Sequence, residues 1–253
     1  MSSLQIVGLG ALAGGTIYLG LPFAKLHPPR ALQGFLTAMA TGILFFLLYD
    51  VLSQATEPVD TALKHAADGT FVADLLVLIL GLSVGLLALV LFEKRFLRGE
   101  PGVAPSGRML GYMIASGIGL HNFSEGLAIG QAATTGALEL AALLIIGFGM
   151  HNMTEGFGIS APLGGDMSWT FIGLAGLIGG GPTFLGTIVG MAFHSTLVFV
   201  LFLALAAGSI IYVLSQLIPL IRRAQAQQLV MTGLVVGFTL AYGTDLFLMA
   251  AGA

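Results

Sequence analysis

The amino-acid sequence predicts an all-α integral membrane protein, a bundle of about eight transmembrane helices with both termini outside. Two observations support this fold class. Hydrophobic residues make up 57% of the 253-residue chain and charged residues only 8%, whereas about a quarter of the residues in a soluble domain are charged. The apolar residues also form long continuous runs without period-two alternation, which favours helices over a β-barrel.

The positions of the expected spans follow from the thickness of the bilayer. A hydrocarbon core of about 30 Å requires roughly 20 apolar residues in a helix. The stretches that meet this requirement are 4–24, 31–53, 71–92, 109–133, 138–162, 170–192, 196–220 and 229–252. Only two expected connections are long, the polar segment 54–70 and the basic segment 93–108. Residues 1–253 are therefore expected to form one transmembrane domain.

The basic residues predict the orientation of this bundle. Only Lys64 would lie outside, and the other basic residues fall in connections that the positive-inside rule makes cytoplasmic: Lys25, Arg30, Lys94, Arg95, Arg98, Arg108, Arg222 and Arg223. The Met1–Gln5 start lacks the basic region of a signal peptide, so we expect the first span to be retained. The expected location is the cytoplasmic (inner) cell membrane.

Several function classes are disfavoured by composition. The chain has no cysteine, which excludes disulfides and thiolate metal ligands. A net charge of −3 is too small to indicate a nucleic-acid partner. The phosphate-binding pattern G-x-x-x-x-G-K-[ST] is missing from the sequence, so a nucleotide-driven process is not indicated.

Two matched polar segments lie within the fourth and fifth expected spans. The fourth reads GLHNFSEGLAIG and the fifth reads GMHNMTEGFGIS, so H-N-x-x-E-G occurs twice, 30 residues apart. Residues four apart share a helix face. Each span therefore presents an imidazole beside a carboxylate, His121 with Glu125 and His151 with Glu155. Ionisable residues at membrane depth are costly and are functional candidates by default.

The residue types in these segments indicate a metal site. Two imidazoles and two carboxylates form a four-ligand shell that suits zinc, ferrous iron or manganese. Two carboxylates balance one divalent cation and would repel each other without it. Asn122 and Asn152 are neighbouring candidate ligands. The structural alternative is that these polar residues only link helices, but two matched segments favour metal binding. A zinc protease would require H-E-x-x-H, which does not occur.

These motifs resemble those of the ZIP (Zrt/Irt-like protein) family of divalent metal-ion transporters. His121, Asn122, Glu125 and Gly126 match the H-N-x-x-E-G of its span four. In span five the usual H-x-x-P-E-G is matched by His151, Glu155 and Gly156, with Thr154 in place of proline. LALAAGSIIYVLSQLIP (203–219) and VVGFTLAYGTDLFL (235–248) are similar to spans seven and eight, although Gln216 stands where a glutamate is common.

The resemblance implies transport of a divalent metal towards the cytoplasm by alternating access. The metal would be held between spans four and five, with zinc the expected ion and iron, manganese or cadmium the alternatives. The partners would be the metal ion and the lipid bilayer, with a homodimer left open, and no resident cofactor is expected. An intramembrane metalloenzyme with a His/Glu-ligated metal is the alternative, but no activating residue or cofactor motif stands out, so no enzymatic activity is expected.

Span six departs from the family pattern. Many members with two metals carry a glutamate there, whereas this chain reads GGGPTFLGT and aligns Thr183 with that position. We therefore expect one tightly held metal. The segment Gly179–Pro182 predicts a broken or bent helix.

Other polar residues are weaker candidates. Asp50, near the outer end of span two, either receives metal at the entrance or caps the span. Asp245 and His194 are better explained as interfacial residues. His65 in the outer connection is a weak candidate for capturing metal, since it is one histidine among acidic residues, and His27 has no evident partner.

Overall fold

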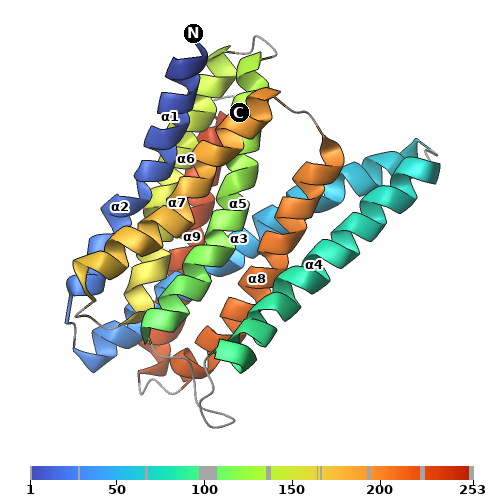
Figure 1. The fold of residues 1–253 in the computed structure, drawn as a ribbon. Coiled ribbons are helices and arrows are strands. Elements are labelled where there is room, and N and C mark those ends of the chain that lie inside the picture. The colour runs from blue at the N-terminus through green and yellow to red at the C-terminus, as the bar shows by residue number, and fades with distance from the viewer. Residues whose placement is uncertain are drawn as a thin grey trace.

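The computed structural model describes residues 2–27, 29–65, 68–96, 107–134, 138–163, 165, 167–192, 195–222 and 226–250. Every regular element within these ranges is a helix (Figure 1). The α-helices are α1 (Ser3–Gly15), α2 (Ile17–Gly20), α3 (Arg30–Lys64), α4 (Asp68–Phe96), α5 (Gly107–Thr134), α6 (Leu138–Ser160), α7 (Trp169–Ala192), α8 (Thr196–Arg222) and α9 (Gln227–Ala250). Two short 3-10 helices, η1 (Leu21–Lys25) and η2 (Ala161–Leu163), follow α2 and α6.

The helices confirm the all-α membrane class. Six segments of the described chain are long and apolar enough to cross a membrane: Ser3–Lys25, Arg30–Lys64, Gly69–Leu91, Trp169–Ala192, Thr196–Arg222 and Gln227–Leu246. The helices α5 and α6, which carry the two polar motifs, are not among these six. Helices occupy the described part of each expected range, but the count of eight spans and the external termini stay predictions.

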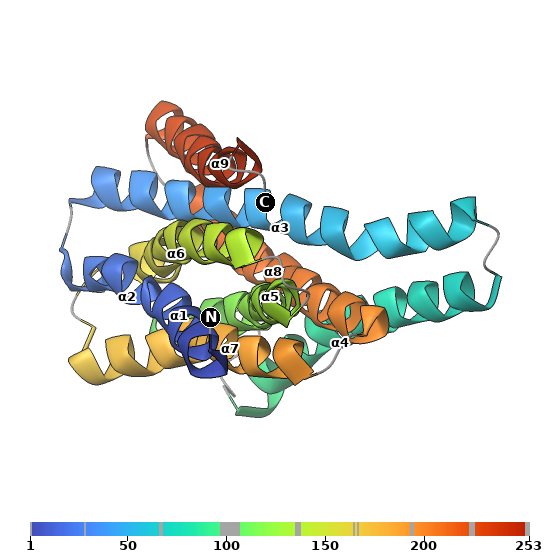
Figure 2. The ribbon, with the colours of Figure 1, turned by 90° about the horizontal axis from the view of Figure 1, so that it is seen from above.

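The long polar connection expected at 54–70 is mostly helical, so that prediction is wrong. The helix α3 continues to Lys64 with Pro58 inside it, and α4 begins at Asp68. The helix persists because Ala55, Val59 and Ala62 form a buried stripe at helical spacing. Figure 2 shows these ends of α3 and α4 running side by side beyond the rest of the bundle.

The first expected span, 4–24, is divided into α1, α2 and η1. The division falls at Thr16, directly after Gly14 and Gly15. The Thr16 hydroxyl lies 2.7 Å from the carbonyl oxygen of Ala13, and glycines are poor helix formers. A hydroxyl that competes for a backbone acceptor explains a kink at this position.

The helices pack as two groups. The first group consists of α1, α2, α5, α6 and α7, in which α5 packs most extensively against α7. The second group consists of α3, α4, α8 and α9, with α3 against α8 and α9 and α4 against α8. Contacts of α5 with α8 and of α6 with α3 and α9 join the groups. The two polar motifs therefore both belong to the first group, on helices that also face the second.

Glycines hold α5 and α7 in backbone contact. Gly126 and Gly130 on α5, like Gly186 and Gly190 on α7, are spaced as G-x-x-x-G. A Cβ added at Gly126 would overlap the carbonyl oxygen of Thr183, and the other three positions are equally crowded by the opposite backbone. Small residues at this spacing allow membrane helices to approach closely, so α5 and α7 form a tight pair.

The helix α7 is not broken at Gly179–Pro182, and that part of the prediction is wrong. It runs without interruption from Trp169 to Ala192. Pro182 has no N–H to donate to the Ile178 carbonyl, and this carbonyl oxygen faces Gly119 of α5. The proline thus lies inside a continuous helix, at a place where α5 packs closely against α7.

Candidate metal site

The first imidazole–carboxylate pair lies in the buried middle of α5. His121 and Glu125 are only 1% and 5% exposed. The Nε2 of His121 lies 3.3 Å from the Oε1 of Glu125. The spacing of one helical turn therefore brings the imidazole and the carboxylate together, as the sequence predicts.

Asn122 connects this pair to α6 and α7. Its Nδ2 donates to the Oε2 of Glu155 at 2.9 Å and to the carbonyl oxygen of Gly179 at 3.0 Å. A carboxamide nitrogen carries two hydrogens, so both bonds form together. Asn122 and Glu155 are fully buried. The asparagine therefore fixes one oxygen of the Glu155 carboxylate at the meeting of three helices.

Asn152 occupies the same motif position on α6 but faces a different helix. Its Nδ2 donates to the Ala13 carbonyl oxygen of α1 at 3.1 Å. This carbonyl is the one that also lies beside the hydroxyl of Thr16, at the division between α1 and α2. Asn152 is therefore a packing contact to the kinked first span in this arrangement.

The side chain of His151 lies outside the part of the chain that the structure describes. Its backbone belongs to α6, one turn before Glu155. Within the described residues, no three His, Asp or Glu side chains form a group arranged to hold a metal ion. The described ligand candidates come as the pair His121–Glu125 and the neighbouring Glu155, and the four-ligand shell stays a prediction.

Several buried oxygens near this pair have no hydrogen-bond partner among the described residues. They include Asn122 Oδ1, Glu125 Oε2, Ser124 Oγ and Thr183 Oγ1. Most buried polar atoms in proteins have a partner, and oxygens of this kind are ligands for divalent cations. The chemistry of the donors therefore fits a metal ion as substrate.

Thr183 lies next to this segment on α7. It is fully buried, and Gly126 of α5 and Gly14 of α1 approach it from two sides. Its carbonyl oxygen accepts a hydrogen bond of 2.8 Å from the hydroxyl of Thr187. Its own hydroxyl is neutral, so it brings an oxygen but no charge to this place.

Two further carboxylates lie on α3 and α9, on the side of the second helix group. Asp50 on α3 is half-buried, accepts a 2.9 Å hydrogen bond from Gln54, and lies within electrostatic range of His121, Glu125 and Glu155. Asp245 on α9 is within range of Asp50. The sequence identified both residues but not these electrostatic interactions, since they depend on how α3 and α9 pack.

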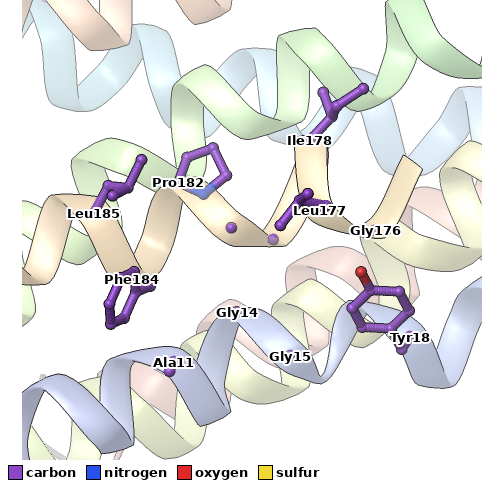
Figure 3. A pocket seen from close by; sticks show the side chains of 12 residues that line it. Ala11, Gly14, Gly15, Tyr18, Gly176, Leu177, Ile178, Pro182, Phe184 and Leu185 are labelled. Carbon is purple, nitrogen blue, oxygen red and sulfur yellow. The ribbon is translucent and has the colours of Figure 1, made fainter. Parts of the chain in front are cut away.

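The remaining candidate residues give no further support for a metal site. His27 and His65 are exposed, Gln216 is half-buried, and His194 lies outside the described residues. A cavity of about 540 Å³ between α1, α2 and α7 is lined by apolar residues, glycines and Tyr18 (Figure 3). It contains no imidazole or carboxylate and therefore supplies no metal ligand.

The helices and the buried polar side chains together define a multi-pass membrane protein with imidazole, carboxylate and amide groups enclosed among its helices. The family model of the ZIP zinc transporter matches residues 99–244, more than half of the chain, from the segment before α5 to Thr244 in α9. The chain belongs to the ZIP zinc transporter family. No curated protein matches the sequence individually. The family consists of divalent metal transporters, so the metalloenzyme alternative is not supported.

Proposed function

We propose that the chain carries a divalent transition-metal ion, zinc foremost, across the cytoplasmic membrane and towards the cytoplasm. The observation that carries the proposal is the buried network in which His121 contacts Glu125 while Asn122 contacts Glu155. The proposed ligands are His121, Glu125, His151 and Glu155, with Asn122 and Asn152 as neighbours. Zinc suits this set because it binds imidazole and carboxylate without requiring thiolate.

The proposed direction rests on the charges of the chain and of the substrate. The basic residues concentrate in the connections that we take as cytoplasmic. Two positive charges that cross a potential of 100 mV gain about 4.6 kcal/mol, which favours inward movement without a nucleotide.

Alternating access is supported by the two groups of helices. The glycine contacts between α5 and α7 join these helices tightly, so the ligand-bearing group moves as one body. The contacts of α5 with α8 and of α6 with α3 and α9 are those that slide or rock when the site changes its exposure. Asp50, which interacts electrostatically with the site, and Asp245, which interacts with Asp50, receive the ion at the entrance.

Metal uptake into sealed proteoliposomes tests the function. The unmodified chain should accumulate zinc when a potential is imposed, and the variant Glu125→Ala/Glu155→Ala should not. Asp60→Asn, which removes an exposed carboxylate of α3, is the matched control and should retain uptake. Wild-type uptake in the double glutamate variant would refute the proposed site.

A further inference from the structure

We propose that a second, weaker site holds a hydrated divalent cation where the ends of α3 and α4 meet α8. A cavity of about 430 Å³ lies there. Its polar lining comes from Glu57, Thr61 and His65 at the end of α3, Thr70 and Asp74 on α4, and Thr196 at the start of α8. None of these residues belongs to α5, α6 or α7, so the cavity is separate from the site described above.

Asp74 is the residue that points to a ligand. Its side chain is only 2% exposed although it lines the cavity. Among the residues that the structure describes, none donates a hydrogen bond to its carboxylate or forms an ion pair with it. Its carboxylate oxygens face the cavity, and a carboxylate there needs water or a cation as its partner, because an unpaired charge is strongly unfavourable away from water. A cation in the cavity would supply the missing partner.

The other lining groups favour a cation over an anion. Glu57 adds a second carboxylate, and His65 and three threonine hydroxyls add further donors. No lysine or arginine is among the lining residues of this described cavity. Hard divalent cations prefer such oxygen ligands. The electrostatics of the cavity are therefore those of a cation site.

The size and spacing of the cavity favour an ion that keeps its water. Within the described chain no three His, Asp or Glu side chains converge to coordinate a metal directly. A cavity of about 430 Å³ has room for several water molecules, each of which occupies about 30 Å³ in the liquid. Hydrated cations can be held through water by a few carboxylates, so binding here should be weak and sensitive to salt.

From the position of this cavity we infer a role in transport, and this inference rests on the proposed function. Glu57 lies two helical turns beyond Asp50 on α3, about 10 Å along the helix axis. Residues seven apart share a helix face. The cavity lies at the end of α3 that we take as external, so it would concentrate metal ahead of Asp50 and the buried site.

Manganese binding tests the proposal without requiring transport. Purified full-length chain carrying His121→Ala, Glu125→Ala and Glu155→Ala has lost its described transport ligands, and Mn²⁺ binding to it is followed by the electron paramagnetic resonance signal of the free ion. We expect about one weakly bound ion per chain, in the affinity range of weak all-oxygen sites. Adding Asp74→Asn should weaken this binding by about tenfold or more, whereas adding Asp60→Asn should not.

Two further measurements distinguish a loss of Mn²⁺ binding from a loss of folding. Asp74→Asn should unfold at the same or a higher temperature than the parent in the absence of metal, because it removes a carboxylate that has no partner among the described residues. Asp74→Glu should retain Mn²⁺ binding. Equal binding in the Asp74→Asn and Asp60→Asn chains, or no Mn²⁺ binding in the parent triple variant, would overturn the proposal. Failure of the unmodified chain to take up zinc would instead overturn only the proposed function.

Discussion

The two copies of H-N-x-x-E-G contain the same residues, but these residues lie in different surroundings. In α5, Asn122 donates to the Glu155 carboxylate and to α7, whereas in α6 Asn152 donates to a backbone carbonyl of α1. The two glycines differ only in partner, since Gly126 faces α7 and Gly156 faces the carbonyl of Ile17 in α2. A repeated motif can therefore repeat its polar residues and its close helix contacts without repeating the role of every residue.

The difference arises from the neighbours of each helix. The helix α5 lies against α6, α7 and α8, and its asparagine meets Glu155 of α6 and the backbone of α7. The helix α6 lies against α5 but also against α1 and α2, and its asparagine meets the end of α1 instead. An amide one position after a ligand points about 100° around the helix, and what lies in that direction decides its function.

The largest expected effect comes from the carboxylates, where the two copies should be equivalent. Glu125→Ala and Glu155→Ala should each lower initial zinc uptake by about 100-fold or more, because removal of one charged ligand leaves the bound cation uncompensated. Initial rates in proteoliposomes at saturating zinc measure this. A tenfold difference between the two variants would show that the copies do not contribute equally to one site.

The two asparagines should differ. Asn122→Leu removes a hydrogen bond to a charged group and leaves Glu155 unsupported, so metal affinity should fall by about tenfold. Asn152→Leu should leave affinity within about twofold and should lower the unfolding temperature, because the Ala13 carbonyl loses a donor. Zinc titration and thermal unfolding of both variants provide the comparison, and equal losses of affinity would contradict the assigned roles.

The two glycines should respond alike. Gly126→Ala and Gly156→Ala each place a Cβ against an opposing backbone and should lower the free energy of unfolding by about 1–3 kcal/mol. Gly158→Ala on α6 is the control, since a Cβ there meets nothing within 4 Å and alanine is the better helix former. Denaturant unfolding in mixed micelles measures all three, and equal stability of the three variants would argue against backbone contact at the motifs.

The smallest expected effect concerns Thr183. It brings no charge to its place beside Gly126, and a second cation near the first needs additional carboxylates to offset repulsion. Thr183→Glu should raise the amount of bound metal from about one ion per chain towards two. Equilibrium dialysis with zinc measures the ratio. An unchanged ratio would show that Thr183 does not stand where two-metal relatives carry their glutamate.

Structural features that depend on local periodicity could be predicted from the sequence. Length and composition predicted the helical ranges, and the spacing of His121 and Glu125 predicted their contact. The extension of α3 to Lys64 was not predicted, because residues 54–64 are polar on average. The helical spacing of the apolar residues Ala55, Val59 and Ala62, which are buried, was the sequence signal for this extension.

Contacts between helices could not be predicted from the sequence. The bond from Asn122 to Glu155 and the burial of Asp74 depend on which helices become neighbours. Pro182 predicted a break in α7, yet the close packing of Gly119 against Ile178 accompanies a continuous helix. Periodicity identifies the face of a helix, but tertiary packing decides what that face meets.

Anomalous X-ray scattering from crystals of zinc-loaded protein would locate the bound ion and so test the proposed zinc site. We expect one strongly occupied zinc position between α5 and α6, about 2.0–2.2 Å from nitrogen and oxygen ligands supplied by His121, Glu125, His151 or Glu155. A strong position away from these side chains, or two equally occupied positions between the helices of the unmodified chain, would contradict it.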